Sequence, residues 1–166
     1  MESRDIVVRP VAPADLASLI TLNNDHPIEL SIVDADRLRA LLSAAALATA
    51  IGRISEPDAF LIAFDDAAPP QGPNHAWFLE RRTHFLYVDR VCVAPRVRKR
   101  GLARALYVDA LAAAARRGAT TLCCEVNSDP PNLASDAFHA ALGFHEVGSA
   151  FLADRGKTVR YLERAV

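Results

Sequence analysis

Two different spacings of hydrophobic and polar positions run along the chain, which predicts a fold of mixed strands and helices. Short apolar runs predict strands, here over residues 6–9, 49–54, 59–64, 85–93, 121–127, 146–153 and 158–164. Segments with apolar residues on one side predict helices, here over residues 13–24, 35–46, 98–116 and 133–142. The resulting order, β-α-α-β-β-β-α-β-α-β-β, indicates a mixed α/β sheet in a single domain over residues 1–166.

One long stretch, residues 65–83, interrupts this pattern. It contains Pro69, Pro70, Gly72 and Pro73, and these residue types predict a long irregular loop. The aromatic pair at positions 77 and 78 falls in this loop, where it could cover either a bound molecule or the core.

Composition narrows the class of protein. The chain has 166 residues, of which 51% are hydrophobic, and a formal net charge of −1. A chain of this length can bury about 70% of its unfolded surface in one domain. The near-neutral charge gives no overall attraction to nucleic acid, and no apolar stretch approaches the ~20 residues of a membrane span. The first residues, 1–5, do not resemble a signal peptide, so a cytoplasmic protein is expected.

The three cysteines indicate neither a metal site nor a disulfide. Cys92, Cys123 and Cys124 all lie in predicted buried strands. Adjacent residues of a strand point to opposite faces of the sheet, which argues against a zinc pair at Cys123 and Cys124. We therefore interpret the cysteines as small hydrophobic residues in a reducing compartment, and expect no metal.

The most informative segment is Arg98-Lys99-Arg100-Gly101-Leu102-Ala103, between an apolar strand and an Ala/Leu-rich helix. A glycine and a small residue at the beginning of a helix let the backbone approach a ligand closely. The first turn of the helix offers unpaired N–H groups and the positive end of the helix dipole. This arrangement predicts a phosphate or pyrophosphate site. The alternatives are an ordinary turn with solvated basic residues, or a patch for nucleic acid, which the lack of interleaved aromatics disfavours.

The spacing of this segment matches neither a Walker A loop nor a dinucleotide fingerprint. With the preceding Val91 to Pro95, the pattern Arg98-x-x-Gly101-x-Ala103 instead resembles the acetyl-CoA signature of the GNAT superfamily of N-acetyltransferases. A second segment, from Asn132 to Phe144, resembles the other GNAT signature, in which an Asn, a short helix and Leu-Gly-Phe follow a buried strand. Asn132 is a suitable N-cap and Gly143 a suitable residue after the last turn.

The resemblance implies a GNAT-like, mostly antiparallel sheet with flanking helices and acetyl-CoA as the co-substrate. The pantetheine would contact the backbone of the strand before the first signature, and the pyrophosphate would lie on the N–H groups and basic side chains of the signature itself. The expected cofactor-binding residues are Val91, Cys92, Val93, Arg98, Lys99, Arg100, Gly101, Leu102, Ala103, Arg104, Asn132 and Phe138.

Acetyl transfer to an amine needs a base, and Glu125 is the first candidate. It is the only acidic residue in the apolar strand from Leu122 to Val126, and burial of an unpaired carboxyl group raises its pKa. In the ribosomal-protein N-acetyltransferase branch of the family, a Glu similar in placement serves as the base. The alternative is a structural Glu paired with Arg90. Asp89 is the second candidate, with a structural ion pair as its own alternative.

The chain departs from the family at His139, which aligns with the Tyr that is the general acid in most members. A neutral imidazole can donate a hydrogen bond or shuttle a proton, so His139 could take over this role. Alternatively, His139 binds substrate or only packs. If the acid role is right, His139→Ala should lower turnover much more than acetyl-CoA affinity.

The expected function is acetyl transfer from acetyl-CoA to a primary amine, on a small molecule or a peptide. The alternative is a non-catalytic acyl-CoA-binding regulatory domain. No nucleic-acid or membrane partner is expected, and paired sheet edges could form a homodimer. The candidate acceptor-lining residues are Asn23, Asn24, Asp25, His26, Glu29, Trp77, Phe78 and Tyr87.

Overall fold

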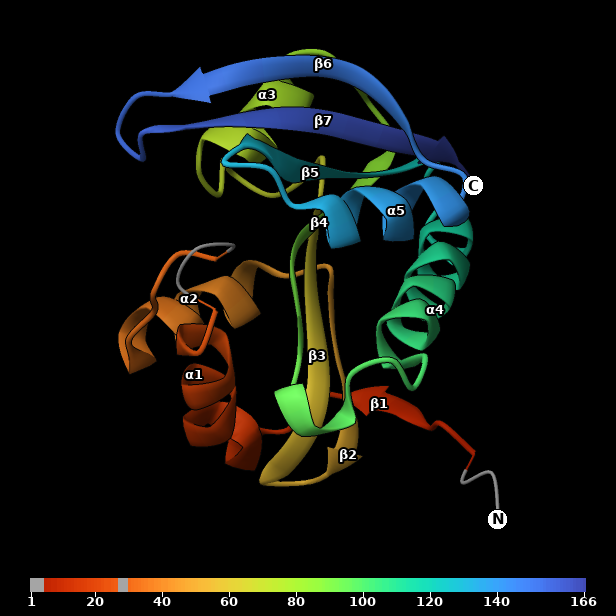
Figure 1. Cartoon of the computed structure of the whole chain (residues 1–166). Coiled ribbons are helices and arrows are strands. Elements are labelled where there is room, and N and C mark those ends of the chain that lie inside the picture. Colours follow the sequence, from red (N-terminus) through yellow and green to blue (C-terminus); the bar gives the residue numbers. More distant parts are fainter. Residues whose placement is uncertain (1–4, 27–29) are drawn as a thin grey trace. The chain divides into compact units, whose positions relative to one another are not determined.

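The computed structural model describes residues 5–26 and 30–166 (Figure 1). Its strands are β1 (Val8–Pro10), β2 (Leu47–Arg53), β3 (Glu56–Asp65), β4 (Phe85–Val93), β5 (Thr121–Asp129), β6 (His145–Leu152) and β7 (Lys157–Ala165). Its α-helices are α1 (Leu16–Asn24), α2 (Ala35–Ala44), α3 (Pro73–Leu79), α4 (Leu102–Arg116) and α5 (Leu133–Ala141). Short 3-10 turns at Pro13–Asp15 and Pro95–Val97 precede α1 and α4.

The described chain forms two compact units, and each is built from two segments. Unit 1 contains the chain up to Ala63 together with Arg90–Ala113, and unit 2 contains Phe64–Asp89 and Ala114–Val166. The division passes within β3, β4 and α4. The expectation of a single domain stays a prediction.

The strands form a mixed sheet that is mostly antiparallel, as expected. Their hydrogen-bonded order is β1-β2-β3-β4-β5-β7-β6. In unit 1, β2 pairs antiparallel with both β1 and β3. In unit 2, β4 pairs with β5 in parallel, while β7 pairs antiparallel with β5 and with β6.

The predicted helices form where capping signals and apolar faces agree. Asp34 caps α2, because its carboxylate accepts a hydrogen bond from the backbone N–H of Arg37 at 2.7 Å. Leu38 and Leu41 of α2 are fully buried in unit 1, so this amphipathic helix is held by packing of its apolar side. None of the helices in the described ranges is long and apolar enough to cross a membrane.

The expectation of an irregular loop over residues 65–83 is wrong in part. Helix α3 lies within it and begins at Pro73, directly after Gly72 (φ +97°). Proline is favourable at the first position of a helix, where its missing N–H is not needed. His75 and Phe78 are buried, and their packing in unit 2 stabilises a helix too short to form alone.

Two further boundaries differ from those predicted. The first strand begins at Val8 instead of residue 6 and includes Pro10 as its last residue, which is compatible with an edge strand because one side of such a strand needs no N–H donor. The turn between β2 and β3 contains only residues 54 and 55, and Ser55 adopts a positive φ of 69°. The prediction placed this turn at residues 55–58, since Pro57 indicated a turn.

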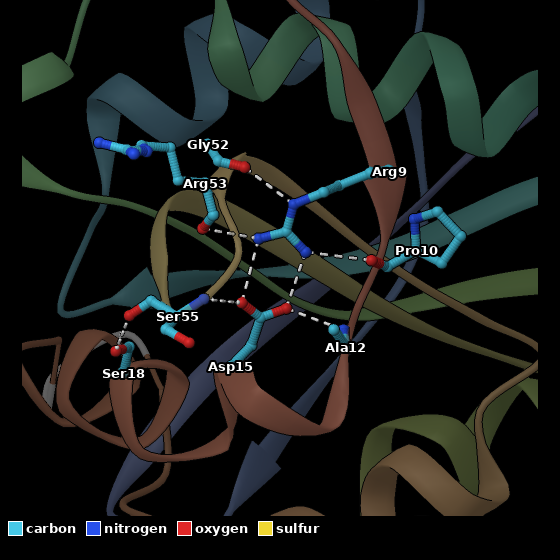
Figure 2. A network of polar contacts seen from close by, with 8 residues as sticks. All are labelled: Arg9, Pro10, Ala12, Asp15, Ser18, Gly52, Arg53 and Ser55. Atoms are coloured by element: carbon cyan, nitrogen blue, oxygen red, sulfur yellow. Dashed lines mark hydrogen bonds and ion pairs between the residues drawn. The ribbon is translucent and has the colours of Figure 1, made fainter.

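A buried ion pair in unit 1 holds β1 against the beginning of α1 (Figure 2). The carboxylate of Asp15 is fully buried and accepts two hydrogen bonds from the guanidinium of Arg9, at 2.7 and 3.0 Å. It also accepts from the backbone N–H groups of Ala12, at 2.8 Å, and Ser55, at 2.9 Å. Burial alone would raise the pKa of Asp15, but the hydrogen bonds from Arg9 and these N–H groups outweigh it and hold the pKa below its usual value.

The Arg9–Asp15 pair also stabilises the turn between β2 and β3. Arg9 donates further hydrogen bonds to the carbonyl groups of Gly52, at 2.8 Å, and Arg53, at 2.9 Å. The hydroxyl of Ser18 in α1 donates to the carbonyl of Ser55 at 2.6 Å. Residues 9–18 and the distant turn at residues 52–55 are therefore joined by one cluster of polar contacts.

Candidate active site

The first predicted signature forms a turn before α4, in unit 1. Helix α4 begins at Leu102, so residues 98–101 precede the helix instead of forming its first turn. Lys99 and Gly101 both adopt left-handed backbone conformations, with φ of +62° and +82°. Among the described residues, a Cβ added at Gly101 would meet Ile6 alone, at 3.9 Å, so no protein contact excludes a side chain there and the positive φ is what favours glycine.

This turn carries an exposed cluster of positive charge. Arg98, Lys99, Arg100 and Arg104 are all exposed, while the neighbouring Leu102 is buried and anchors the turn. The carbonyl of residue 101 accepts the N–H of Ala105 at 3.0 Å, which is the beginning of the helical ladder. The backbone N–H groups that precede Ala105 in the first turn have no partner within the helix. The turn therefore has the donors and the charge that a pyrophosphate group requires.

The strand before the turn has the expected alternation. In β4, Cys92 is buried, and Val91 and Val93 are partly exposed. The N–H of Ala94 donates to the carbonyl of Asp58 at 2.8 Å, which pairs the end of the strand with β3 within unit 1. Cys92, Cys123 and Cys124 are all buried thiols, as expected for small hydrophobic residues of the strands.

In unit 2, Glu125 lies in β5 and is hydrogen-bonded to Tyr87 of β4. The hydroxyl of Tyr87 donates to the Glu125 carboxylate at 2.5 Å, and the tyrosine is only 1% exposed. Burial raises the pKa of Glu125 to about 7, although the hydrogen bond from Tyr87 acts against it, and the charge of Asp89 raises it further. A carboxyl group of this pKa exchanges its proton near neutral pH, as a general base must.

Aromatic residues from α3 hold Tyr87 in place. The ring of His75 stacks on Tyr87, with centroids 5.5 Å apart and planes 18° apart. The Nδ1 atom of His75 accepts the N–H of Gln71 at 3.1 Å, so Nε2 carries the proton and donates to the carbonyl of Asp65 at 3.0 Å. Burial lowers the pKa of His75, which favours this neutral form. The rotamer of Tyr87 is thus restricted by a ring that is itself fixed from both sides.

A second tyrosine flanks Glu125 on β7. Tyr161 is the cross-strand partner of Glu125, and its hydroxyl donates to the side chain of Asn74 at 3.0 Å. The indole of Trp77 stacks on Tyr161, with centroids 4.1 Å apart. Burial and the charge of Glu125 raise the pKa of Tyr161 to about 12, so it stays protonated.

The alternative partner that the sequence suggested for Glu125 has a different contact. Arg90 is buried in unit 1, where its guanidinium donates to Asn23 at 2.8 Å. Glu125, in unit 2, accepts the hydrogen bond of Tyr87, and Asp89 in the same unit acts on it through its charge. Glu125 and Asp89 are therefore two interacting carboxyl groups of unit 2, and the neutral Tyr87 is hydrogen-bonded to Glu125.

His139 lies in α5 and is 5% exposed. Its Nδ1 atom donates to the carbonyl of Ser135 at 2.7 Å, because a carbonyl oxygen can only accept. Its ring meets those of Phe138 and Phe144 edge-on, with centroids 5.2 and 5.4 Å away. Burial lowers the pKa of His139, so the neutral ring predominates at pH 7. The acid role of His139 stays a prediction, and it would require the protonated ring.

The other expected residues have structural contacts as well. Asn132 caps α5 by accepting the N–H of Ser135 at 3.2 Å, as predicted. Asn24 exchanges hydrogen bonds with the N–H and the carbonyl of Val33, at 3.0 and 2.9 Å. Phe78 is fully buried, so it belongs to the core. Glu29, an expected acceptor-lining residue, lies outside the described residues.

The sequence did not indicate that Tyr87 contacts Glu125. From its position we expected only that Tyr87 lines the acceptor site. The signal was present in the alternation of β4: residues 87 and 89 lie on one face, and Tyr87 pairs in register with Cys123, two residues before Glu125. The parallel pairing of two strands far apart in the chain was needed to interpret it.

The comparisons agree with this fold and with the resemblance to the GNAT family. A family model described as the acetyltransferase (GNAT) family matches residues 40–144. A search of curated proteins found no match.

Solved structures of several acetyltransferases share the fold. The ribosomal-protein-S18-alanine N-acetyltransferase from Escherichia coli is 16% identical, with a TM-score of 0.71, and the match covers 97% of this chain and 94% of that one. A ribosomal-protein-alanine N-acetyltransferase from Brucella melitensis is 21% identical, with a TM-score of 0.74 and coverage of 96% and 99%. Arabidopsis thaliana NAA60, solved with acetyl-CoA, is 14% identical, with a TM-score of 0.74 and coverage of 97% and 98%. At these identities the likeness concerns the fold.

Proposed function

Because the chain belongs to the acetyltransferase (GNAT) family, we propose that it is an acetyl-CoA-dependent N-acetyltransferase acting on a primary amine. The observation that carries this proposal is the Tyr87–Glu125 hydrogen bond at 2.5 Å, with the pKa of Glu125 raised to about 7. A chain that only bound acyl-CoA would gain nothing from a buried carboxyl group adjusted to exchange protons at neutral pH.

The turn before α4 is the proposed holding site for the cofactor. Its positive side chains and the N–H groups of the first turn of α4 would bind the pyrophosphate, and the backbone from Val91 to Val93 would contact the pantetheine. Gly101, with its positive φ, supports this fit because it shapes the turn without adding a side chain. When bound, acetyl-CoA supplies an acetyl group activated as a thioester.

Glu125 is the proposed base. An acceptor amine is protonated near pH 7, and the Glu125 carboxylate would remove one proton before the nitrogen attacks. The nearby charge of Asp89 helps to keep the pKa of Glu125 high, so Asp89 is proposed as a residue that adjusts the base. From ammonium ion to amide the nitrogen loses two protons: one is released to solvent, and the other reaches the departing thiolate.

Tyr87 is better suited than His139 to return that proton. Its hydroxyl carries a proton and is hydrogen-bonded to Glu125, which could replace the proton once it is given up. Burial and Glu125 raise the pKa of Tyr87 well above its usual value, so it stays protonated and would give up its proton only as it receives the one that Glu125 has taken. His139 is mainly neutral, with Nδ1–H committed to Ser135.

Two substitutions compare these roles. We expect Tyr87→Phe to lower kcat by about 10²-fold or more, since it removes the group that holds and relays a proton. We expect His139→Ala to lower kcat less than Tyr87→Phe, with acetyl-CoA affinity retained in both. Steady-state kinetics with calorimetric titration of acetyl-CoA would measure both effects. A larger loss of kcat in His139→Ala than in Tyr87→Phe would return the acid role to His139.

Cofactor binding can be tested without knowing the acceptor. We expect calorimetric titration at moderate salt to show one acetyl-CoA per chain, and the Arg98→Ala/Arg100→Ala double variant to bind about tenfold or more weakly, since two charge-assisted contacts are lost. Arg37→Ala/Arg39→Ala, on α2, is a matched control that removes two exposed arginines outside the turn. Absence of binding by the wild type at millimolar acetyl-CoA would refute the proposed function.

The acceptor is proposed as a small-molecule or peptide amine. Two of the structural relatives are named for acetylating ribosomal-protein alanine, so peptides with a free N-terminal alanine are reasonable first acceptors to screen, followed by amino acids and polyamines. Release of free thiol would report turnover. Binding of acetyl-CoA without turnover on any amine would favour the alternative, a non-catalytic acyl-CoA-binding domain.

A further inference from the structure

The first arginine of the phosphate-binding turn is in contact with a histidine from another segment of unit 1. The Nη2 atom of Arg98 lies 2.9 Å from Nε2 of His26, which follows α1. The Nδ1 atom of the same ring lies 2.9 Å from the carbonyl of Leu22. Because the carbonyl can only accept, Nδ1 carries the proton, and Nε2 is left as the acceptor for the guanidinium.

His26 is itself held firmly. Its backbone N–H donates to the carbonyl of Asn23 at 3.1 Å, and its own carbonyl accepts the N–H of Leu30 at 2.9 Å. The side chain of Asn23 is completely buried and accepts a hydrogen bond from Arg90 at 2.8 Å. The imidazole that contacts Arg98 is therefore fixed to the buried part of unit 1, although Arg98 itself is exposed.

An exposed arginine normally samples many rotamers, and binding an anion requires that this freedom be given up. A guanidinium has five N–H donors in a rigid plane, so one hydrogen bond to His26 restricts its orientation and leaves the other donors for a ligand. A histidine in contact with a cation adds no charge of its own while it is neutral. Its effect on an anion must therefore act through Arg98.

We propose that His26 is a positioning residue for the cofactor, which holds Arg98 in the orientation that receives the pyrophosphate of acetyl-CoA. This inference rests on the proposed function, because it takes the turn before α4 as the cofactor site. It extends that site to a residue of the α1–α2 connection, which belongs to neither signature. It also means that the end of α1 and the cofactor-binding turn are linked through one side-chain contact.

A double-mutant cycle tests this mechanism. We expect His26→Ala to weaken acetyl-CoA binding about three- to tenfold, as measured by calorimetry, since one hydrogen bond that orients a charged group is lost. In steady-state kinetics the KM for acetyl-CoA should rise by a similar factor, with kcat unchanged. In an Arg98→Ala background, His26→Ala should cause no further loss, because His26 acts only through Arg98.

Two more variants complete the experiment. His26→Gln keeps a side-chain acceptor and should recover part of the affinity, which a merely structural role of the imidazole would not predict. His145→Ala is the matched control, since His145 is exposed on β6 and its nearest ion-pair partner is Glu163, at 3.9 Å. It should bind acetyl-CoA as the wild type does.

The outcomes separate this inference from the proposed function. Unchanged affinity in His26→Ala, or an equal loss with and without Arg98, would overturn the role of His26 while acetyl-CoA binding by the wild type still stands. A wild type that binds no acetyl-CoA would overturn both.

Discussion

Glu125→Gln is expected to lower kcat by about 10²- to 10⁴-fold and to leave acetyl-CoA affinity largely unchanged. The substitution preserves the size of the side chain and an oxygen that can accept the hydrogen bond of Tyr87, but the amide cannot take a proton from the acceptor amine. Single-turnover or steady-state assays of thiol release, with calorimetry for the cofactor, would measure both quantities.

The dependence of kcat on pH is a second measurement that tests Glu125 as the base. Only the ionised carboxylate is a base, and the pKa of Glu125 is about 7. We therefore expect kcat to rise with pH through about 7 in the wild type and to lack this rise in Glu125→Gln. Glu163→Gln, which changes a carboxylate on β7 that pairs with Arg82 at 3.0 Å, is the control and should keep the wild-type profile. An unaltered profile in Glu125→Gln would assign the base to another residue, with Asp89 the next to test.

The raised pKa of Glu125 also has a consequence for stability. A carboxyl group whose folded pKa lies above its unfolded value stabilises the folded state fully below the unfolded pKa, and this contribution is lost as pH rises through the folded pKa. For Glu125 this contribution is lost as the pH rises from its ordinary pKa of 4.5 to about 7. Glu125→Gln should therefore be more stable than the wild type above pH 7, so any loss of activity there would not come from unfolding.

Asp15→Ala is expected to destabilise the fold by about 3 to 5 kcal/mol. The substitution would leave the guanidinium of Arg9, whose side chain is only 18% exposed, without its counter-ion. It would also leave the N–H groups of Ala12 and Ser55 without an acceptor. Urea unfolding at pH 7 would measure the difference in free energy of unfolding between the wild type and Asp15→Ala.

Two comparisons make this result specific to the buried pair. Asp36→Ala removes a carboxylate whose side chain is 97% exposed and pairs with Arg39, so its effect should stay below about 1 kcal/mol. The double variant Arg9→Ala/Asp15→Ala should lose less stability than the sum of the single variants, because the uncompensated charge is gone. Equal effects of Asp15→Ala and Asp36→Ala would show that the pair in Figure 2 does not support the fold.

Acid should weaken the same pair. The pKa of Asp15 is held below its usual value, so its contribution to stability is present above the unfolded pKa and is lost as pH falls through the folded pKa. The wild type should therefore lose more stability than Asp15→Ala as the pH is lowered below 4 or so, in the region of the usual Asp pKa of about 3.9.

Local signals in the sequence determined much of the fold and the place of the turn that we propose as the cofactor site. Strand β4 was predicted with both of its observed ends, and Asp34 and Asn132 form the caps that their residue types indicate. Gly101 adopts the positive φ that makes a glycine useful at the beginning of a helix. These features depend on a few neighbouring residues, so a linear pattern is sufficient to encode them.

The tertiary structure decided what depends on residues far apart in the chain. Tyr87 and Glu125 are separated by 38 positions, and only the parallel pairing of β4 with β5 makes them a hydrogen-bonded pair. The pKa of about 7 then follows from burial, from Tyr87 and from Asp89, none of which the strand of Glu125 could supply alone. Helix α3 likewise forms inside a proline-rich stretch because packing of His75 and Phe78 stabilises it. Burial and the choice of polar partner are properties of the folded neighbourhood, which is why the sequence indicated the candidate base but not the tyrosine that accompanies it.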